Sequence, residues 1–291
     1  MLLLEAVGLM LLGLAASFIG SMLGIGGGLI ILPVLAVFGV PIHDAIGASL
    51  VAVITTSTVT GSTEARAELT NIRLAMLLEI ATTSGAIIGA VISLMLGLKV
   101  LAAFMFVVLV ASAIRMMRPD PGSVIHPSGA HAHNKDREHE REDTLARRLR
   151  LSGTYYDESL GRQVIYRVTK TPFGLALSAF AGAVSGLLGI GGGVIKVPAM
   201  TGVMCVPIKV ASATSNLMIG VTACASASIF YMHGNIDALL TAMLMLGVVP
   251  GSALGMRLAS RAPRVFLRRL FIVMLLAAAV LMLFRAFGVV G

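Results

Sequence analysis

The sequence predicts an all-α polytopic membrane protein built from two inverted-topology repeats, each of about five helical segments with one short segment broken by glycine and proline. Hydrophobic residues make up 57% of the 291-residue chain and charged residues only 12%, against ~25% charged in soluble domains. Half of the charged residues lie in 118–171, which leaves long apolar runs elsewhere, and ~20 such residues span a bilayer as a helix. The two flanking regions also repeat one another.

This composition excludes a cytosolic enzyme, a secreted disulfide scaffold and a disordered chain. The net charge of +8 would suggest a nucleic-acid partner in a soluble protein, but here the basic residues gather at segment ends, where they orient a membrane protein. We therefore expect a multi-pass protein of a bacterial inner membrane that binds no nucleic acid. Cys205 and Cys224 lie inside apolar runs, so we expect two separate buried thiols.

The repeat is visible as motifs in the same order in both halves. Residues 23–28 read LGIGGG, and residues 188–193 read LGIGGG again. A proline follows each triple glycine after five residues, at Pro33 and Pro198. Such a duplication decides the fold. Each half also carries a pair of glycines four residues apart, for which we expect a role in helix packing: Gly85 with Gly89, and Gly251 with Gly255.

Each half divides into five apolar segments. They are residues 2–23, 28–40, 45–61, 72–97 and 100–117, then 172–188, 193–206, 209–232, 236–259 and 264–289. The second segment of each half has only about 13–14 residues, fewer than a bilayer-spanning helix needs. Short segments interrupted by glycine and proline, at matching places in two halves, are typical of a transporter's binding site.

An odd number of segments per half gives the two halves opposite orientations. With 118–171 in the cytoplasm, the loops near 62–73 and 257–269 are also cytoplasmic, and they contain Arg66, Arg73, Arg257, Arg261, Arg264, Arg268 and Arg269. The opposite loops contain Lys99 and, over 232–238, no Lys or Arg, as the positive-inside rule requires. We expect ten traversals, or eight traversals plus two hairpins formed by the first two segments of each half.

Three parts follow: a first membrane repeat at 1–117, a charged cytoplasmic insertion at 118–171 and a second membrane repeat at 172–291. Inside the insertion, residues 135–150 suggest a charged helix, and the segment from Tyr155 to Val168 suggests a hairpin around Gly161. Its histidines lack cysteine partners and a regular site spacing, so we predict no metal site; they are His131, His133 and His139.

The two glycine clusters are the predicted binding site. Glycine permits positive φ and close approach to the backbone. A helix that begins after such a turn presents unpaired N–H groups and the positive end of its dipole, which together bind anions. Neither cluster continues as a nucleotide fingerprint. We predict that the clusters face each other near the midplane and hold a small oxyanion, and the candidates are Gly24, Gly26, Gly27, Gly28, Gly189, Gly191, Gly192 and Gly193.

Polar residues inside apolar runs are further candidates. Ser49, Ser215 and Asn216 follow the short segments. They either donate to substrate oxygens or form hydrogen bonds with a neighbouring helix. Lys196, three residues after the second cluster, either pairs with the anion or extends to the membrane surface. Glu79 has no acidic counterpart in the second half, and we expect it to carry a coupling proton if burial favours its neutral form.

The GxGGG pattern with its following proline, once per half, resembles the TauE/SafE family of sulfite and organosulfonate exporters, also called the 4-toluene sulfonate uptake permease family. The residues that carry the resemblance are Gly24, Gly26, Gly27, Gly28, Pro33, Gly189, Gly191, Gly192, Gly193 and Pro198. It covers 1–117 and 172–291 and leaves out the insertion. It implies a carrier of sulfite, sulfoacetate, thiosulfate or related anions in either direction.

From these observations we expect a non-enzymatic secondary transporter that exports a sulfur-containing oxyanion by alternating access. It would use a proton or cation gradient and no cofactor. Assembly into a homo-oligomer is an open alternative to a monomer. The alternatives are an uptake carrier or a channel for another small anion such as thiosulfate or a carboxylate. A rhomboid-like serine protease built on Ser185 and His233 is the least favoured, because the first half has no matching histidine.

Overall fold

The computed structural model describes residues 2–23, 25–66, 69–117, 143–157, 162–259, 272–273 and 275–283. The first half forms α1 (Leu2–Leu23), α2 (Gly28–Val37), α3 (Ile42–Arg66), α4 (Ile72–Met95) and α5 (Leu98–Met117). The insertion forms α7 (Thr144–Arg148), β1 (Gly153–Asp157) and β2 (Arg162–Tyr166). The second half forms α8 (Thr171–Leu188), α9 (Gly193–Gly202), α10 (Ile208–Met232) and α11 (Ala238–Ala259).

The chain is therefore the all-α membrane protein that the sequence predicts. Within the described ranges, six helices are long and apolar enough to cross a membrane, namely α1, α3, α4, α8, α10 and α11. Their ends lie close to the predicted segment ends. The predicted last segment, 264–289, is described only at 272–273 and 275–283, where it is helical.

The short second segment of each half forms a helix, α2 or α9, that is too short to cross a bilayer alone. α2 and α9 have ten residues each, which gives a length of about 15 Å at 1.5 Å per residue. A bilayer core is ~30 Å thick. This length fits the alternative with two hairpins, in which α1 turns into α2 and α8 turns into α9, and it does not fit ten full traversals.

The first helix of each half packs along the fourth helix of the other half, since α1 packs along α11 and α8 packs along α4. A Cβ added at Gly89 would lie 2.0 Å from the carbonyl oxygen of Ala183, and one at Gly255 would lie 2.3 Å from that of Phe18. These helix backbones touch, as in other membrane helix pairs with small residues four apart. The predicted packing role is thus confirmed for all four glycines: Gly85, Gly89, Gly251 and Gly255.

We expect Gly89→Leu to destabilise the protein strongly, because the new side chain would overlap the α8 backbone. Overpacking of this kind costs about 1–3 kcal/mol or more. Gly8→Leu is the matched control, since no atom lies within 4 Å of a Cβ at Gly8 on the exposed part of α1. The measurement is the melting temperature in detergent. Equal melting temperatures for the two variants would contradict the tight contact of α4 with α8.

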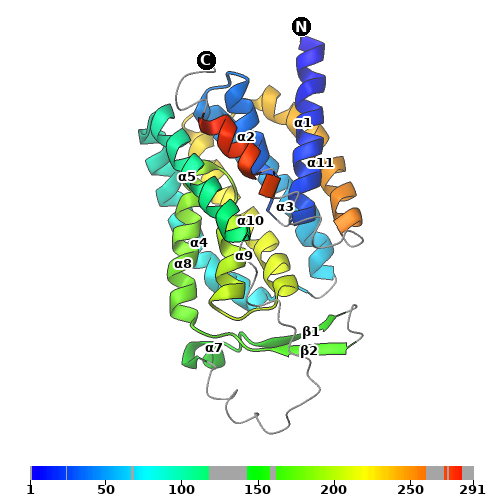
Figure 1. Ribbon diagram of the computed structural model, residues 1–291, viewed down its shortest axis with the longest axis vertical. Helices are drawn as coiled ribbons and strands as arrows, with labels where there is room; N and C mark the ends of the chain where they lie inside the picture. Colours follow the sequence, from blue (N-terminus) through cyan, green and yellow to red (C-terminus); the bar gives the residue numbers. More distant parts are fainter. Residues whose placement is uncertain are drawn as a thin grey trace.

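The two ends of the molecule carry different loops. In Figure 1, α1 begins at the end marked N, whereas α8 begins at the opposite end, beside the hairpin of β1 and β2. Asn71, just before α4, contacts the insertion there. Asn235, after α10, lies instead against Gly47 near the start of α3. The loops that the Lys and Arg count assigns to opposite sides are therefore at opposite ends, which is the arrangement that inverted repeats require.

The described part of the insertion packs against the start of α4, the second half of α9 and the start of α10. β1 and β2 pair antiparallel as predicted, with Tyr155 opposite Val164. The Asn71 side-chain N–H groups donate to the Leu151 carbonyl at 2.6 Å and to the Tyr166 hydroxyl at 2.8 Å. Burial raises the pKa of Tyr166, and its hydrogen bond with Asn71 acts in the opposite direction.

Parts of the predicted insertion fall outside the described residues. These are Gly161, the histidines of 131–139 and the first part of the predicted helix at 135–150. The described end of that predicted helix is α7, which begins after Asp143. The Asp143 carboxylate accepts hydrogen bonds from the N–H groups of Leu145 in α7 and Thr171 at the start of α8, so it fastens the insertion to the second half.

Candidate functional site

Both glycine clusters break the chain between two helices as predicted. Gly26 and Gly27 have φ angles of 83° and 68°, and Gly191 and Gly192 have φ angles of 78° and 71°. Side chains other than glycine adopt this left-handed region only with strain. Gly27 and Gly192 are the N-cap residues of α2 and α9, so each turn delivers the chain into the start of a short helix. Gly24 lies outside the described residues.

The two breaks lie next to each other in the middle of the protein. The hydroxyl of Ser49 on α3 is 3.1 Å from the carbonyl oxygen of Gly28 and 2.9 Å from that of Gly189. These residues belong to different breaks, 161 positions apart in the sequence. Ser49 therefore joins the first break to the second.

Two apolar side chains fill the space between the breaks. Val53 on α3 and Ile219 on α10 both lie within 3.5 Å of the position that a Cβ would take at Gly26, and the same is true at Gly191. The inner faces of the two turns are thus closed by the crossing of α3 and α10.

The backbone donors of the breaks are only partly available. At the first break the Gly28 N–H donates to the Gly26 carbonyl at 2.7 Å, and at the second the Gly189 N–H donates to the Ser185 carbonyl at 2.8 Å. These two amides are used within the turns, contrary to the prediction. In the part of the chain that the structure describes, the N–H groups of Gly191, Gly192 and Gly193 have no hydrogen-bond partner.

The predicted serine and asparagine donors have different environments. Ser49 has a single hydroxyl hydrogen, which is directed at the carbonyl oxygens of Gly28 and Gly189. In this structure Ser49 therefore connects the two breaks and has no hydrogen left to donate to a substrate. Ser215, its counterpart in the second half, is fully buried and its hydroxyl lacks a partner among the described residues. Asn216 is 3% exposed and its backbone carbonyl accepts a hydrogen bond from Ser57.

Lys196 is buried at the second break, so the alternative that it extends to the surface is wrong. Its side chain is 1% exposed, and its ammonium donates to the Thr222 hydroxyl on α10 at 2.7 Å. Its Cε lies 3.5 Å from the position of a Cβ at Gly192. The lysine therefore touches the glycine turn along its stem and reaches α10 with its charged end.

The charge of Lys196 faces Glu79 on α4. The distance from the Lys196 Nζ to the Glu79 Oε2 is 3.9 Å, and the carboxylate is 13% exposed. The Thr222 hydroxyl, which accepts from the lysine, lies 2.7 Å from the Glu79 Oε1 and donates to it. Sequence reasoning singled out both charged residues but missed their pairing.

Two further hydroxyls complete the surroundings of the carboxylate. Thr82 donates to the Glu79 Oε2 at 2.9 Å, and Thr83 donates to the Oε1 at 2.9 Å. The carboxylate is thus surrounded by threonine hydroxyls from α4 and α10, with one cation at the outer limit of an ion pair. Such a polar network in a low-dielectric interior is held firmly when each member has a partner.

Ser185 is the residue on which the least favoured alternative, a serine protease, depends. It is fully buried, and its Cβ lies 3.1 Å from the position of a Cβ at Gly192. Its hydroxyl has no hydrogen-bond partner in the described ranges, while His233 is bonded to the Ile229 carbonyl. The serine–histidine pair that a protease needs is therefore not formed, and the Ser185 side chain instead lies beside the second break.

The two breaks differ in chemistry although they match in backbone shape. At an offset of 165 positions, Ile31 corresponds to Lys196 and Gly20 corresponds to Ser185. The first break therefore has neither the cation nor the hydroxyl. The polar groups that suit an anion gather at the second break.

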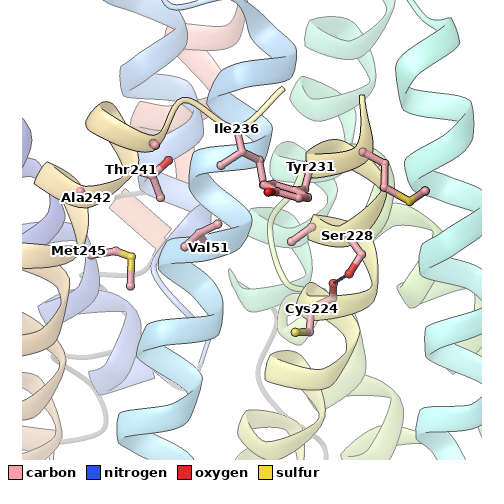
Figure 2. A pocket seen from close by; sticks show the side chains of 11 residues that line it. Val51, Cys224, Ser228, Tyr231, Ile236, Thr241, Ala242 and Met245 are labelled. Atoms are coloured by element: carbon pink, nitrogen blue, oxygen red, sulfur yellow. Dashed lines mark hydrogen bonds between the residues drawn. The ribbon is translucent and has the colours of Figure 1, made fainter. Parts of the chain in front are cut away.

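The structure also has an open groove of about 440 Å³ away from both breaks, between α3, α10 and α11 (Figure 2). Its lining is mainly apolar and without charged side chains, for example Val51, Tyr231 and Met245. The groove offers an anion few donors, and we do not assign the site to it.

Cys224 also lines this groove. Both Cys205 and Cys224 are unpaired and exposed, so the prediction of buried thiols is wrong.

Among the described residues, no group of three or more His, Cys, Asp or Glu side chains is placed to hold a metal ion. Anion binding at the second break would thus depend on amides, hydroxyls and one ammonium group. These are the groups that bind oxyanions through hydrogen bonds and charge.

Comparison with known proteins agrees with this picture. A family model described as "Sulfite exporter TauE/SafE" matches residues 9–282. The chain is similar to the "Probable membrane transporter protein YunE" of Bacillus subtilis (strain 168), with 26% identity over 255 residues that cover 85% of this chain and 86% of that protein. No solved structure matches.

Proposed function

The chain belongs to the sulfite exporter TauE/SafE family, and from this premise we propose that it exports a small sulfur-containing oxyanion, such as sulfite or an organosulfonate, by alternating access. Membership makes the chain a multi-pass membrane transporter. The observation that carries the choice of substrate charge is the second glycine break. Three of its amide N–H groups have no partner among the described residues, and the Cε of the buried Lys196 lies 3.5 Å from the position of a Cβ at Gly192.

We assign substrate binding to this break. The amides of Gly191, Gly192 and Gly193 point along the start of α9, where the helix dipole favours negative charge. The Lys196 ammonium adds a full positive charge, and Ser215 on α10 adds a hydroxyl. Gly26, Gly27 and Gly28 of the first break lie on the other side of Val53 and Ile219, and Asn216 lies near the junction of α3 and α10.

Alternating access follows from the hairpins in this proposal. The α1–α2 and α8–α9 hairpins belong to inverted repeats at 1–117 and 172–291, with 118–171 in the cytoplasm. Each hairpin packs on the fourth helix of the other half, α11 or α4, so tilting of one pair against the other opens the breaks to one side at a time. Glu79 is the candidate for proton coupling.

A flux assay with purified protein in liposomes tests this function. We expect saturable flux of sulfite, thiosulfate or sulfoacetate at least ~10-fold faster than of acetate, because an added polar contact in a built site gives discrimination of this order or more. Taurine tests whether a neighbouring ammonium group is tolerated. Accumulation against a gradient distinguishes a carrier from a channel. Flux no faster than in empty liposomes for every sulfur anion would overturn the proposal.

A further inference from the structure

Lys196 lies between the second glycine break and Glu79. Lys196 touches the second glycine break with its Cε, which lies 3.5 Å from the position of a Cβ at Gly192. Its Nζ points to Thr222 and Glu79. Because 3.9 Å is longer than a hydrogen bond, the lysine is connected to the carboxylate mainly through the Thr222 hydroxyl. A rotation about the side-chain bonds of the flexible lysine would move its ammonium group toward the break.

We propose that Glu79 is the internal counter-ion of Lys196 in the empty carrier, and that a substrate anion takes over Lys196 only when Glu79 binds a proton. This inference rests on the proposed function and adds its coupling step. The site would then bind one anion and one proton together. Ser185 contributes a second donor to the anion, because its buried hydroxyl beside Gly192 has no partner among the described residues.

The proton requirement follows from burial. If the anion draws Lys196 away, the Glu79 carboxylate keeps only the hydroxyls of Thr82, Thr83 and Thr222. The Glu79 side chain is only 13% exposed, and a charge that is largely removed from water is unfavourable without a counter-ion, so protonation offsets the loss of the lysine. The step is balanced: the proton from solution joins a Glu79 oxygen, the lysine remains an ammonium, and its ion pair passes from the carboxylate to the substrate.

No other charged group in the described part of the chain competes for this role. α8, which packs on α4, has no titratable side chain. α10 carries Lys209, Cys224 and Tyr231, but Lys209 is 13 positions from Thr222, or about 20 Å along the helix, and the other two are exposed. On α4 itself, Arg73 donates to the Arg150 carbonyl in the insertion.

Calorimetric titration tests the inference on purified full-length protein. Methanesulfonate is the probe, since a sulfonate keeps its charge across the neutral pH range. Comparing the binding heat in two buffers of different ionisation enthalpy gives the number of protons taken up. We expect close to one proton per anion for the wild type at a pH where Glu79 is ionised in the empty carrier, and about a tenfold loss of affinity per pH unit above it.

The variant Glu79→Gln keeps the hydrogen-bonding shape without the charge, so we expect it to bind methanesulfonate with no proton uptake and with an affinity independent of pH. Glu5→Gln on the exposed part of α1 is the control and should behave as the wild type. Proton uptake that persists in Glu79→Gln, or wild-type binding without uptake, overturns the inference and leaves the proposed function standing. If the wild type binds none of methanesulfonate, sulfite or thiosulfate at any pH, the proposed function fails instead.

Discussion

Replacing Gly192 by valine is expected to reduce anion flux at least ~100-fold while the protein still inserts and purifies as a folded species. Two effects add at this position. The φ of 71° is strained for a β-branched residue by about 1–2 kcal/mol. A Cβ would also lie 3.0 Å from the Ala181 carbonyl oxygen and 3.1 Å from the Ser185 Cβ. The new side chain would fill the place where the amides meet the anion.

The control for this variant is Gly39→Val. Gly39 has a φ of 86° and no atom within 4 Å of an added Cβ, so it carries the same backbone strain without entering the site. Flux in liposomes, normalised to the amount of inserted protein, is the measurement. We expect near wild-type flux for Gly39→Val and loss of flux for Gly27→Val at the first break. Wild-type flux in both Gly27→Val and Gly192→Val would exclude the breaks from the transport path.

Removing the charge of Lys196 is the second large effect that we expect. Lys196→Ala leaves the Glu79 carboxylate, whose side chain is 13% exposed, with no cation beside it. Breaking a fully buried pair costs about 3–5 kcal/mol of stability, and this partly exposed pair is expected to cost less. The same variant removes the ammonium from the second break. A charged hydrogen bond is worth up to ~3 kcal/mol, so we expect at least ~100-fold slower flux.

Stability and flux can be separated with the double variant Glu79→Gln/Lys196→Gln. It contains no buried charge at this place, so its melting temperature in detergent should return most of the way to that of the wild type. Its flux should stay as low as that of Lys196→Ala, because the anion has lost its cation. If the double variant transports at the wild-type rate, the pair is structural only and Lys196 has no role in binding.

The elements that follow from composition and local sequence were predictable. The predicted segment at 72–97 became α4 at Ile72–Met95, since segment length and apolar character are imposed by the bilayer. The breaks were predictable for a local reason, because three consecutive glycines disfavour a helix. The packing of Gly89 against Ala183 was also foreseeable, since a pair of small residues four apart lies on one helix face.

The pairing of Glu79 with Lys196 was not predictable from local sequence. The residues lie 117 positions apart, and their contact depends on how α4, α9 and α10 are rotated about their axes. The exposure of Cys224 was mispredicted for a related reason, because an apolar run does not reveal which helix face points to lipid. One signal was available in the sequence. Each half contains a charged residue without a charged counterpart in the other half, and the two charges, of Glu79 and Lys196, are opposite in sign.

The pairing of the Glu79 carboxylate with Lys196 has a consequence for the electrical work of the cycle. With Glu79 and Lys196 of opposite sign, the unloaded pair contributes no net charge. A divalent anion that enters with one proton crosses with one net negative charge, and a potential of 100 mV, negative inside, then contributes about 2.3 kcal/mol to its exit. A monovalent sulfonate with one proton crosses without generating current. Voltage would therefore favour the expulsion of doubly charged solutes over singly charged ones.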